Sequence, residues 1–341
     1  MSIDIDKPLR WTAEAADGSG RPDPATFEML GSLQGNILKG HGRPEVTLLF
    51  FRIVPGAAES AKAVLRDIAS HHVTSAWQQL QDARRLRQTG AGGGAFVHLA
   101  LAQSGYRALG FGNLHAGIPG SEVFHGGMLA SAGAVDDDPA GWEPAFREPI
   151  DGVVLAAHLY RAAADRLADE LQALLTAGGA CTIVRRQQGK SLDNAAGQGI
   201  EHFGYVDGRS QPLLLEEDIQ AEADGTQPQR ITQWDPAFPL RTALVKDPGT
   251  RHPLDFGSYF IFRKLDQNVQ AFKRAEHDVA DRLCLQGEDR ELAGAMLVGR
   301  FEDGTPAVQS SNALGGAVPN DFDYRDDVEG VRCPLDRKSV V

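Results

Sequence analysis

Residues 199–212, which read Gly-Ile-Glu-His-Phe-Gly-Tyr-Val-Asp-Gly-Arg-Ser-Gln-Pro, are the part of this chain best suited to chemistry. Asp207 is an ionisable carboxyl between a glycine and apolar or aromatic neighbours, and Arg209 follows two positions later. Such a carboxylate either caps a turn or serves as a poised acid/base, because Asp-Gly is also a common turn signal. The residues alone leave both interpretations open.

Three other patterns favour ordinary structural roles. The glycine run at residues 90–95 has the letters of a dinucleotide-binding turn, but it leads into a strand and opens no helix, so we predict a flexible hairpin loop. His71 and His72 end a predicted helix with no third ligand nearby in the sequence. The acidic run at residues 136–138 lacks the alternating pattern of a calcium-binding EF-hand loop.

Composition excludes several classes of protein. The chain has 341 residues, enough for one large domain or two ordinary ones, and its formal net charge of −12 disfavours a nucleic-acid-binding surface. No run approaches the roughly 18 apolar residues of a membrane span. Three widely spaced cysteines argue against a disulfide framework, and the N-terminus lacks the apolar core of an export signal. We expect a soluble, cytoplasmic protein without a nucleic-acid or membrane partner.

Strands and helices alternate in the first half of the chain. The apolar, β-branched and aromatic run at residues 46–53 is typical of a strand covered on both faces. Further strands are expected at residues 96–101 and 151–160. Apolar residues at helical spacing predict helices at residues 57–69, 104–109 and 163–176.

The pattern starts again in the second half. Strands are expected at residues 181–185 and 257–263, and a helix begins near residue 267. The long irregular segment between residues 186 and 250 is where we expect a functional site, because such long loops in compact domains are usually functional. The predicted fold class is α+β, with two related ferredoxin-like sandwiches. The expected domains are an N-terminal arm (1–28), a first sandwich (29–177) and a second sandwich (178–341).

The run that contains Gly204-x-x-Asp207-Gly208 resembles the signature of the dye-decolourising peroxidases. These are haem enzymes with two ferredoxin-like domains of the dimeric α/β-barrel type. Four further stretches agree with the family in order, at residues 33–40, 251–265, 298–306 and 322–334. The resemblance therefore spans most of the chain.

The resemblance implies a haem-dependent peroxidase, an oxidoreductase that uses hydrogen peroxide to oxidise dyes, phenols or other bulky organic reductants. The expected cofactor is haem b. Asp207 is then the acid/base that moves a proton between the two peroxide oxygens. The expected cofactor-binding residues are Gly208, Arg209, Ser210, Gln211 and Phe260, although a simple core role fits Phe260 as well. Candidate electron entry points are Trp234, Tyr259 and Tyr324.

The chain departs from the family after Cys333 and Pro334. Family members continue with a segment that holds the axial histidine, whereas here Lys338 falls at that position. A protonated lysine cannot coordinate iron, so the resemblance assigns no metal ligand. The family's distal arginine, which normally lies farther downstream, is also absent.

Two explanations account for this departure. The C-terminus is truncated or replaced, which leaves the second sandwich incomplete, or the chain is a natural short homologue without iron ligation. Both admit an alternative function, in which the chain is a haem-free, catalytically inactive fragment or scaffold. Such a chain is expected to form homo-oligomers through an exposed sheet edge.

Overall fold

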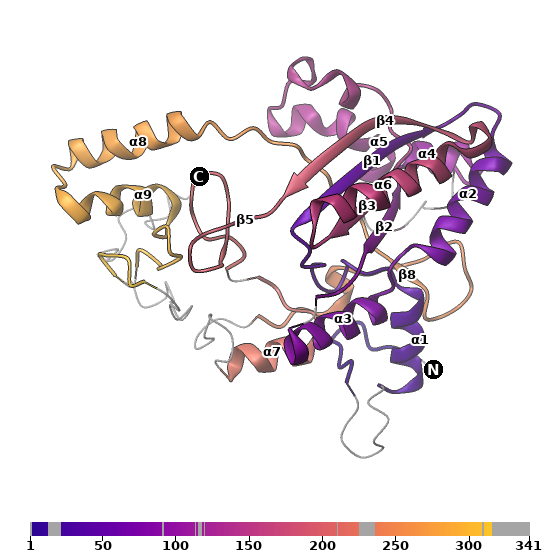
Figure 1. The fold of residues 1–341 in the computed structure, drawn as a ribbon, viewed down its shortest axis with the longest axis horizontal. Helices are drawn as coiled ribbons and strands as arrows, with labels where there is room; N and C mark the ends of the chain where they lie inside the picture. Colours follow the sequence, from indigo (N-terminus) through magenta and orange to yellow (C-terminus); the bar gives the residue numbers. More distant parts are fainter. Residues whose placement is uncertain are drawn as a thin grey trace. The chain divides into compact units, whose positions relative to one another are not determined.

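The computed structural model describes residues 2–12, 22–90, 92–112, 114, 118, 120–209, 211–224, 236–308 and 310–315. The chain divides into two compact units. Figure 1 draws the ribbon coloured along the sequence, with the helices and strands labelled. The first unit comprises residues 1–6, 13–190 and 240–260, and the second comprises residues 7–12, 191–239 and 261–341. None of the helices in these described ranges is long and apolar enough to cross a membrane.

An antiparallel sheet of four strands, in the order β2-β3-β1-β4, forms the centre of the first unit. The strands are β1 (Glu45–Ile53), β2 (Phe96–Leu101), β3 (Gly152–His158) and β4 (Cys181–Lys190). With α2 (Ala58–His71) after β1 and α6 (Arg161–Thr176) after β3, the topology is that of a ferredoxin-like sandwich. The sequence prediction of these strands and helices is confirmed.

The two helices α2 and α6 cover one face of this sheet. Apolar side chains of both helices pack against β1, β2 and β3, and the cluster includes Phe51, Ile68, Val154 and Leu171, each with 0% exposure. The opposite face is also apolar, with Phe96, Leu155 and Ala157 buried on it. Burial on both faces explains why β1 is apolar nearly throughout.

Further helices of the first unit surround the sheet. Asp23 accepts hydrogen bonds from the first backbone amides of α1 (Pro24–Ser32), and Gly90 ends α3 (Ala76–Thr89) in the left-handed region, with φ of 68°. The glycine run therefore joins helix α3 to strand β2, which corrects the hairpin expected there. The remaining elements are α4 (Gln103–Ala108), α5 (Ser121–Ser131), β7 (Val245–Lys246) and β8 (Phe256–Gly257).

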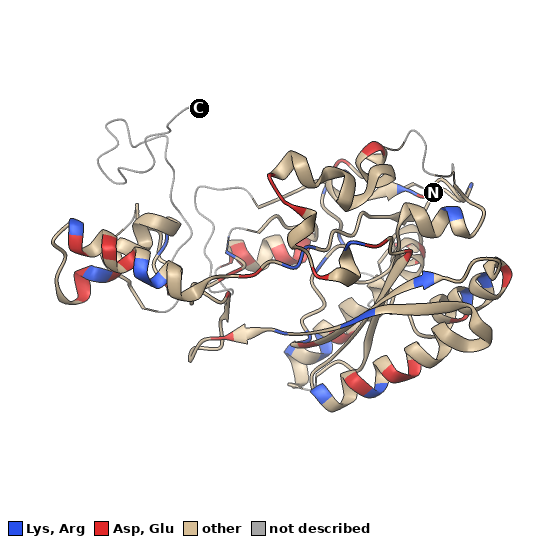
Figure 2. Cartoon of the chain, turned by 90° about the horizontal axis from the view of Figure 1, so that it is seen from above, with Lys and Arg blue, Asp and Glu red and all other residues tan. Residues whose placement is uncertain are grey.

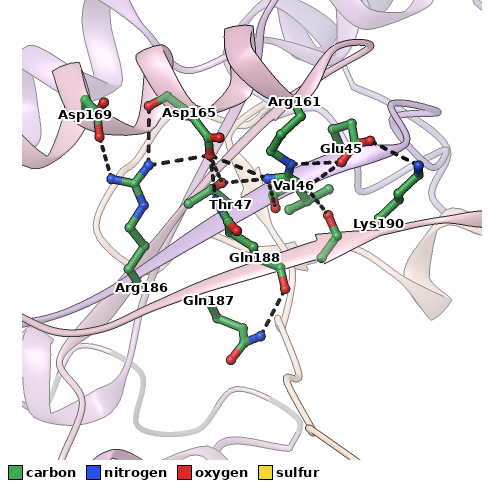
Figure 3. Close-up of polar contacts among 11 residues, drawn as sticks. Glu45, Val46, Thr47, Arg161, Asp165, Asp169, Arg186, Gln187, Gln188 and Lys190 are labelled. Atoms are coloured by element: carbon green, nitrogen blue, oxygen red, sulfur yellow. Dashed lines mark hydrogen bonds and ion pairs between the residues drawn. The ribbon is translucent and has the colours of Figure 1, made fainter.

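A polar network fastens α6 to the sheet edge (Figure 3). The guanidinium of Arg161 donates to the Glu45 carboxylate at 2.5 and 3.0 Å and to the backbone oxygen of Gly189 at 2.6 Å. Arg186 reaches from β4 to Asp165 and Asp169 on α6, at 3.5 and 2.5 Å. Two guanidinium nitrogens of Arg161 converge on one oxygen of Glu45, Oε2, while the group also reaches Gly189 of β4, so this network fixes how α6 lies on β1 and β4.

Helices are the largest regular elements among the described residues of the second unit. Its helices are α7 (Glu216–Ala223), α8 (Val269–Arg282) and α9 (Glu291–Val298), and Figure 2 shows charges of both signs along α8. The Asn268 side chain caps α8 by accepting a hydrogen bond from the Ala271 amide at 3.0 Å. The strands β5 (Leu192–Asp193) and β6 (Gly199–Ile200) pair with each other.

The N-terminal arm is held by backbone hydrogen bonds within the second unit. The Leu9 amide donates to Leu214 O at 2.9 Å, and Leu9 O accepts from the Glu216 amide at 3.0 Å. Trp11 is buried, and its amide donates to the Glu217 carboxylate at 3.0 Å. Residues 13–21 lie outside the described part of the chain.

Two expectations about strand partners need correction. β4 pairs with β1 from Cys181 to Lys190, so it completes the first sheet, whereas the boundary expected between residues 177 and 178 would separate it. The strand expected at residues 257–263 is limited to β8, which pairs with β7 over two residues. In the second unit, the strands formed by the described residues are β5 and β6, which pair with each other. These residues do not form a second ferredoxin-like sheet.

Candidate functional site

The Asp207 loop, defined here as residues 199–209, folds back on itself within the second unit. Ile200 and Val206 form an antiparallel bridge, and the Asp207 amide donates to Gly199 O at 2.9 Å. The Glu201 carboxylate accepts hydrogen bonds from the amides of Phe203 and Tyr205, at 2.8 and 2.9 Å. These bonds fix the backbone on both sides of the turn.

Asp207 itself is exposed. Its Oδ1 accepts a hydrogen bond from the Gly208 amide at 2.7 Å, and Gly208 has φ of 76°, in the left-handed region that favours glycine. The carboxylate thus caps the turn, as one of the two interpretations of the sequence predicts. This bond also orients an accessible carboxylate, so capping and proton transfer are compatible.

Arg209 packs against a second turn, the 300–306 hairpin. Arg300 and Pro306 form the bridge of this hairpin, and Arg209 Nη2 lies 3.5 Å from Asp303 O. Gly304 has φ of 87°, and a Cβ there would lie 2.9 Å from Arg209 Nε. Burial lowers the pKa of Arg209, although the charges of Asp303 and Glu222 act in the opposite direction. The guanidinium at the end of the Asp207 loop is therefore held against the 300–306 hairpin.

Hydrogen bonds make the 300–306 hairpin a firm support for the Asp207 loop. Burial would raise the pKa of Asp303, but hydrogen bonds from Thr305 and from the amide of Gly315 outweigh it and lower that pKa. The Val206 amide donates to Glu302 O at 3.0 Å. Two of the stretches that resemble the peroxidase family, residues 199–212 and 298–306, therefore meet in the folded chain.

The other predicted site residues are placed differently. Gly208 adjoins Asp207, and Gln211 is exposed, with its Nε2 3.5 Å from Arg209 O. Ser210 and Lys338 lie outside the described residues, as do Trp234 and Tyr324. Nothing in the described part of the chain tests a role for these four.

Phe260 lies in the first unit, where it packs against a buried histidine of β2. Its ring centroid is 5.8 Å from that of His98, and the Nδ1 of His98 lies 3.1 Å from Gly35 O. Burial lowers the pKa of His98. Tyr259 packs on Phe124, with ring centroids 5.6 Å apart. These contacts agree with the core role considered for Phe260, and its role as a pocket wall stays a prediction.

A second histidine, His41, lies on the same face of the first sheet. Its ring stacks on Phe96 with centroids 5.0 Å apart, and its Nδ1 accepts a hydrogen bond from the Arg43 amide at 3.0 Å. Burial lowers the pKa of His41 to about 4, and the charges of Arg43 and His98 add to this effect. The imidazole is thus neutral in the folded chain above that pH.

We expect the free energy of unfolding to fall as the pH falls from about 6.5 to about 4, because the unfolded chain then binds a proton that folded His41 refuses. Between about pH 7 and about pH 4.5, His41→Gln should lose less stability than the wild type, by on the order of 2 kcal/mol. Urea unfolding at both pH values measures the difference, with His277→Gln as the exposed control. Equal losses in wild type and His41→Gln would contradict this assignment.

The described residues contain no group of three or more His, Cys, Asp or Glu that could hold a metal ion. A haem site needs different features, namely one axial ligand and polar groups that handle peroxide. Asp207 and Arg209, a carboxylate and a guanidinium on one anchored loop, fit the second requirement. The described part of the chain does not fix the axial ligand.

Sequence reasoning missed one group of residues beside Asp207. Tyr205 is 5% exposed, and its hydroxyl donates to the Glu276 carboxylate of α8, on which Lys273 also lies. Two signals point to them in the sequence. Tyr205 stands two positions before Asp207, and Lys273 and Glu276 have the i, i+3 spacing of neighbours on a helix.

Comparison with known proteins places these elements in a family. Residues 32–191 match the model of the "DyP dimeric alpha+beta barrel domain". The chain is 41% identical over 338 residues to the multifunctional dye peroxidase DyP2 of Amycolatopsis sp., covering 98% of this chain and 68% of that protein. It therefore belongs to the dye-decolourising peroxidase family, and the prediction of this family and of its peroxidase class is confirmed.

Solved structures agree with this assignment. The DyP-type peroxidase of Anabaena sp. has a TM-score of 0.86 at 33% identity, over 97% of this chain and 70% of that one. The Amycolatopsis DyP2 structure has a TM-score of 0.85 at 40% identity, over 98% and 68% of the two chains. The predicted α+β class and dimeric-barrel type of fold are thereby confirmed.

The chain spans part of the length of its relatives. It covers 68% of DyP2, and it covers 60% of a dye-decolorizing peroxidase of Mycena epipterygia, to which it is 29% identical. Because the match to DyP2 runs over 98% of this chain, it lends no support to truncation, and the alternative of a natural short chain is equally untested.

Proposed function

We propose that this chain acts as a haem-dependent peroxidase, which uses hydrogen peroxide to oxidise bulky organic reductants such as dyes and phenols. The observation that carries the proposal is the exposed Asp207 carboxylate on a loop anchored at both ends, beside Arg209, in a chain of the peroxidase family. A cytoplasmic location stays a prediction.

Haem b, when bound, supplies the redox chemistry of the reaction. Asp207 moves the proton. Its carboxylate would accept a proton from one oxygen of hydrogen peroxide and return it to the other, so that the second oxygen leaves as water when the O–O bond breaks; the first oxygen would be taken up, and the electrons supplied, by haem when bound. The Gly208 amide keeps Oδ1 in place during this transfer. Arg209 places a positive charge two residues away, where it favours negative charge that develops on the peroxide.

Gly208, Arg209, Ser210 and Gln211 would line the cofactor from the loop that follows Asp207. Phe260 is proposed as an apolar wall. The iron ligand is not among these residues, since Gly208 has no side chain and the other side chains are suited to packing or hydrogen bonding. A histidine is the natural candidate, and the chain has ten.

The absorption spectrum of the purified chain, expressed with ample haem, tests the proposal. We expect a strong Soret band at about one haem per chain, and a spectral change on adding hydrogen peroxide. Histidine substitutions, beginning with His202→Ala and His252→Ala, would then identify the ligand by the loss of this band. A chain without a Soret band would overturn the proposal and favour the haem-free alternative.

A further inference from the structure

Tyr205, a buried residue of the Asp207 loop, packs against two helices of the second unit, α8 and α9. The Tyr205 ring lies edge-on to the Phe272 ring of α8, with centroids 5.9 Å apart. The Phe203 ring stacks on the Phe272 ring, with centroids 4.3 Å apart. The Tyr205 hydroxyl donates a hydrogen bond to Glu276. The loop therefore presents two aromatic side chains to α8, the phenyl ring of Phe203 and the phenol of Tyr205.

Lys273 links this contact to the hairpin that supports the loop. Its Nζ lies 2.9 Å from Glu276 Oε2 and 2.6 Å from Glu302 Oε1, and 5.4 Å from the centroid of the Tyr205 ring. The backbone oxygen of Glu302 accepts the Val206 amide at 3.0 Å. A closed set of contacts thus runs from Tyr205 through Glu276, Lys273 and Glu302 back to Val206, immediately before Asp207.

Helix α9 leaves no spare room at the phenol. A Cβ on Gly294 would collide with the Tyr205 hydroxyl and lie 2.6 Å from Glu276 Oε1. Only glycine lets the backbone of α9 approach so closely. The close approach makes the contact between phenol and carboxylate sensitive to a single methyl group.

The phenol remains a hydrogen-bond donor at any ordinary pH. Burial raises the pKa of Tyr205 well above its usual range, and the hydrogen bond to Glu276 and the charges of Glu276, Glu302 and Glu201 raise it further. The contact with Glu276 is therefore not lost through deprotonation of the phenol.

We infer that Tyr205 is a positioning residue for Asp207, which it fixes by pinning the Asp207 loop to α8 through Glu276. This inference rests on the proposed peroxidase function for its catalytic consequence. Its structural part stands alone, because the pinned loop is a property of the chain with or without haem. Both parts can be measured separately.

Amide hydrogen exchange tests the structural part. Tyr205→Phe removes one hydroxyl and keeps the ring, so the amides of residues 203–208 should exchange about tenfold faster, while β1 and β3 keep their protection. Tyr160→Phe is the matched control, because Tyr160 is 69% exposed. Unchanged exchange in Tyr205→Phe would overturn the inference.

Two further variants separate pinning from general destabilisation. Glu276→Gln keeps an oxygen that can accept from the phenol and should speed exchange less than Glu276→Leu. The double variant Tyr205→Phe/Glu276→Leu should exchange no faster than Glu276→Leu alone, because both changes break the same contact. Additive effects in the double variant would count against a shared contact.

The rate of reaction with hydrogen peroxide tests the catalytic part in the haem-loaded chain. Tyr205→Phe should lower this rate about tenfold and leave the KM for the reductant unchanged. It should have no further effect in a chain that already carries Asp207→Asn. A loosened loop with an unchanged peroxide rate would overturn the positioning role. If the wild type does not react with peroxide, the proposed function fails, and exchange still decides whether Tyr205 pins the loop.

Discussion

Replacing Asp207 with asparagine is expected to slow the reaction of the haem-loaded chain with hydrogen peroxide by about 10²- to 10⁴-fold, the range typical of a lost general acid/base. Asparagine has nearly the same shape, and its oxygen can still accept the Gly208 amide that now binds Oδ1 at 2.7 Å. The side-chain amide of asparagine, however, cannot take a proton from one oxygen of hydrogen peroxide and return it to the other. Stopped-flow absorption after mixing with peroxide measures the rate.

Controls must show that the change affects proton transfer and not the cofactor or the fold. The haem-to-protein ratio of Asp207→Asn should equal that of the wild type. Asp278→Asn removes an exposed carboxylate from α8 in the same unit and should leave the rate unchanged. Asp207→Glu keeps a carboxyl group, displaced by one methylene, and should retain part of the rate. Equal rates in wild type and Asp207→Asn would contradict the assignment of Asp207 as the acid/base.

Local patterns in the sequence were sufficient for most elements of the first unit. The strand predicted at residues 46–53 is β1, the strand at 96–101 is β2, and the helix at 163–176 lies within α6. Each has a periodicity set by which side chains are buried, and burial of these faces is what the core requires. The patterns therefore carry the information directly.

The partner of a strand is not a local property. The segment at residues 181–185 was correctly predicted as a strand, but its pairing with β1, more than a hundred residues earlier in the chain, could not be inferred from its own pattern. The apolar run at residues 257–263 also has a strand-like composition. In the described part of the chain only Phe256 and Gly257 have strand partners there, and Ile261 is 73% exposed.

In the candidate site, too, a local feature could be predicted from the sequence and the long-range contacts could not. Asp207 was found from its glycine and aromatic neighbours together with the family resemblance. Its support comes from residues far apart in the sequence, since Tyr205 meets Glu276 across 71 positions and Val206 meets Glu302 across nearly a hundred. Such contacts depend on how the loop, α8 and the 300–306 hairpin fold together. Sequence spacing reveals only that Lys273 and Glu276 share one face of a helix.

The second large effect concerns stability, and it is expected at Phe51 in the first unit. Phe51, near the C-terminal end of β1, has 0% exposure, and its register partner on β3 is Gly152. A Cβ on Gly152 would collide with the Phe51 ring and lie 2.8 Å from the backbone oxygen of Ala100. The absence of a side chain at Gly152 therefore makes room for the ring.

Phe51→Ala should lower the free energy of unfolding of the first unit by about 3–5 kcal/mol, because it removes buried apolar surface and leaves a cavity that strands β1 and β3 cannot close. Folded domains are stable by only about 5–15 kcal/mol, so this loss is a large part of the total. Urea unfolding followed by circular dichroism measures it. Phe111→Ala, at a ring that is 45% exposed, is the matched control and should cost less than about 1 kcal/mol.

The pairing of Phe51 with Gly152 gives a sharper form of the same test. Gly152→Ala should destabilise the wild-type chain, because the added methyl group meets the ring. In a chain that already carries Phe51→Ala, the ring is gone and only the approach to Ala100 O remains, so the same change should cost less. Additive losses would show that the ring does not occupy the space above Gly152. A small loss for Phe51→Ala alone would mean that the core described around β1 is not the one that stabilises the unit.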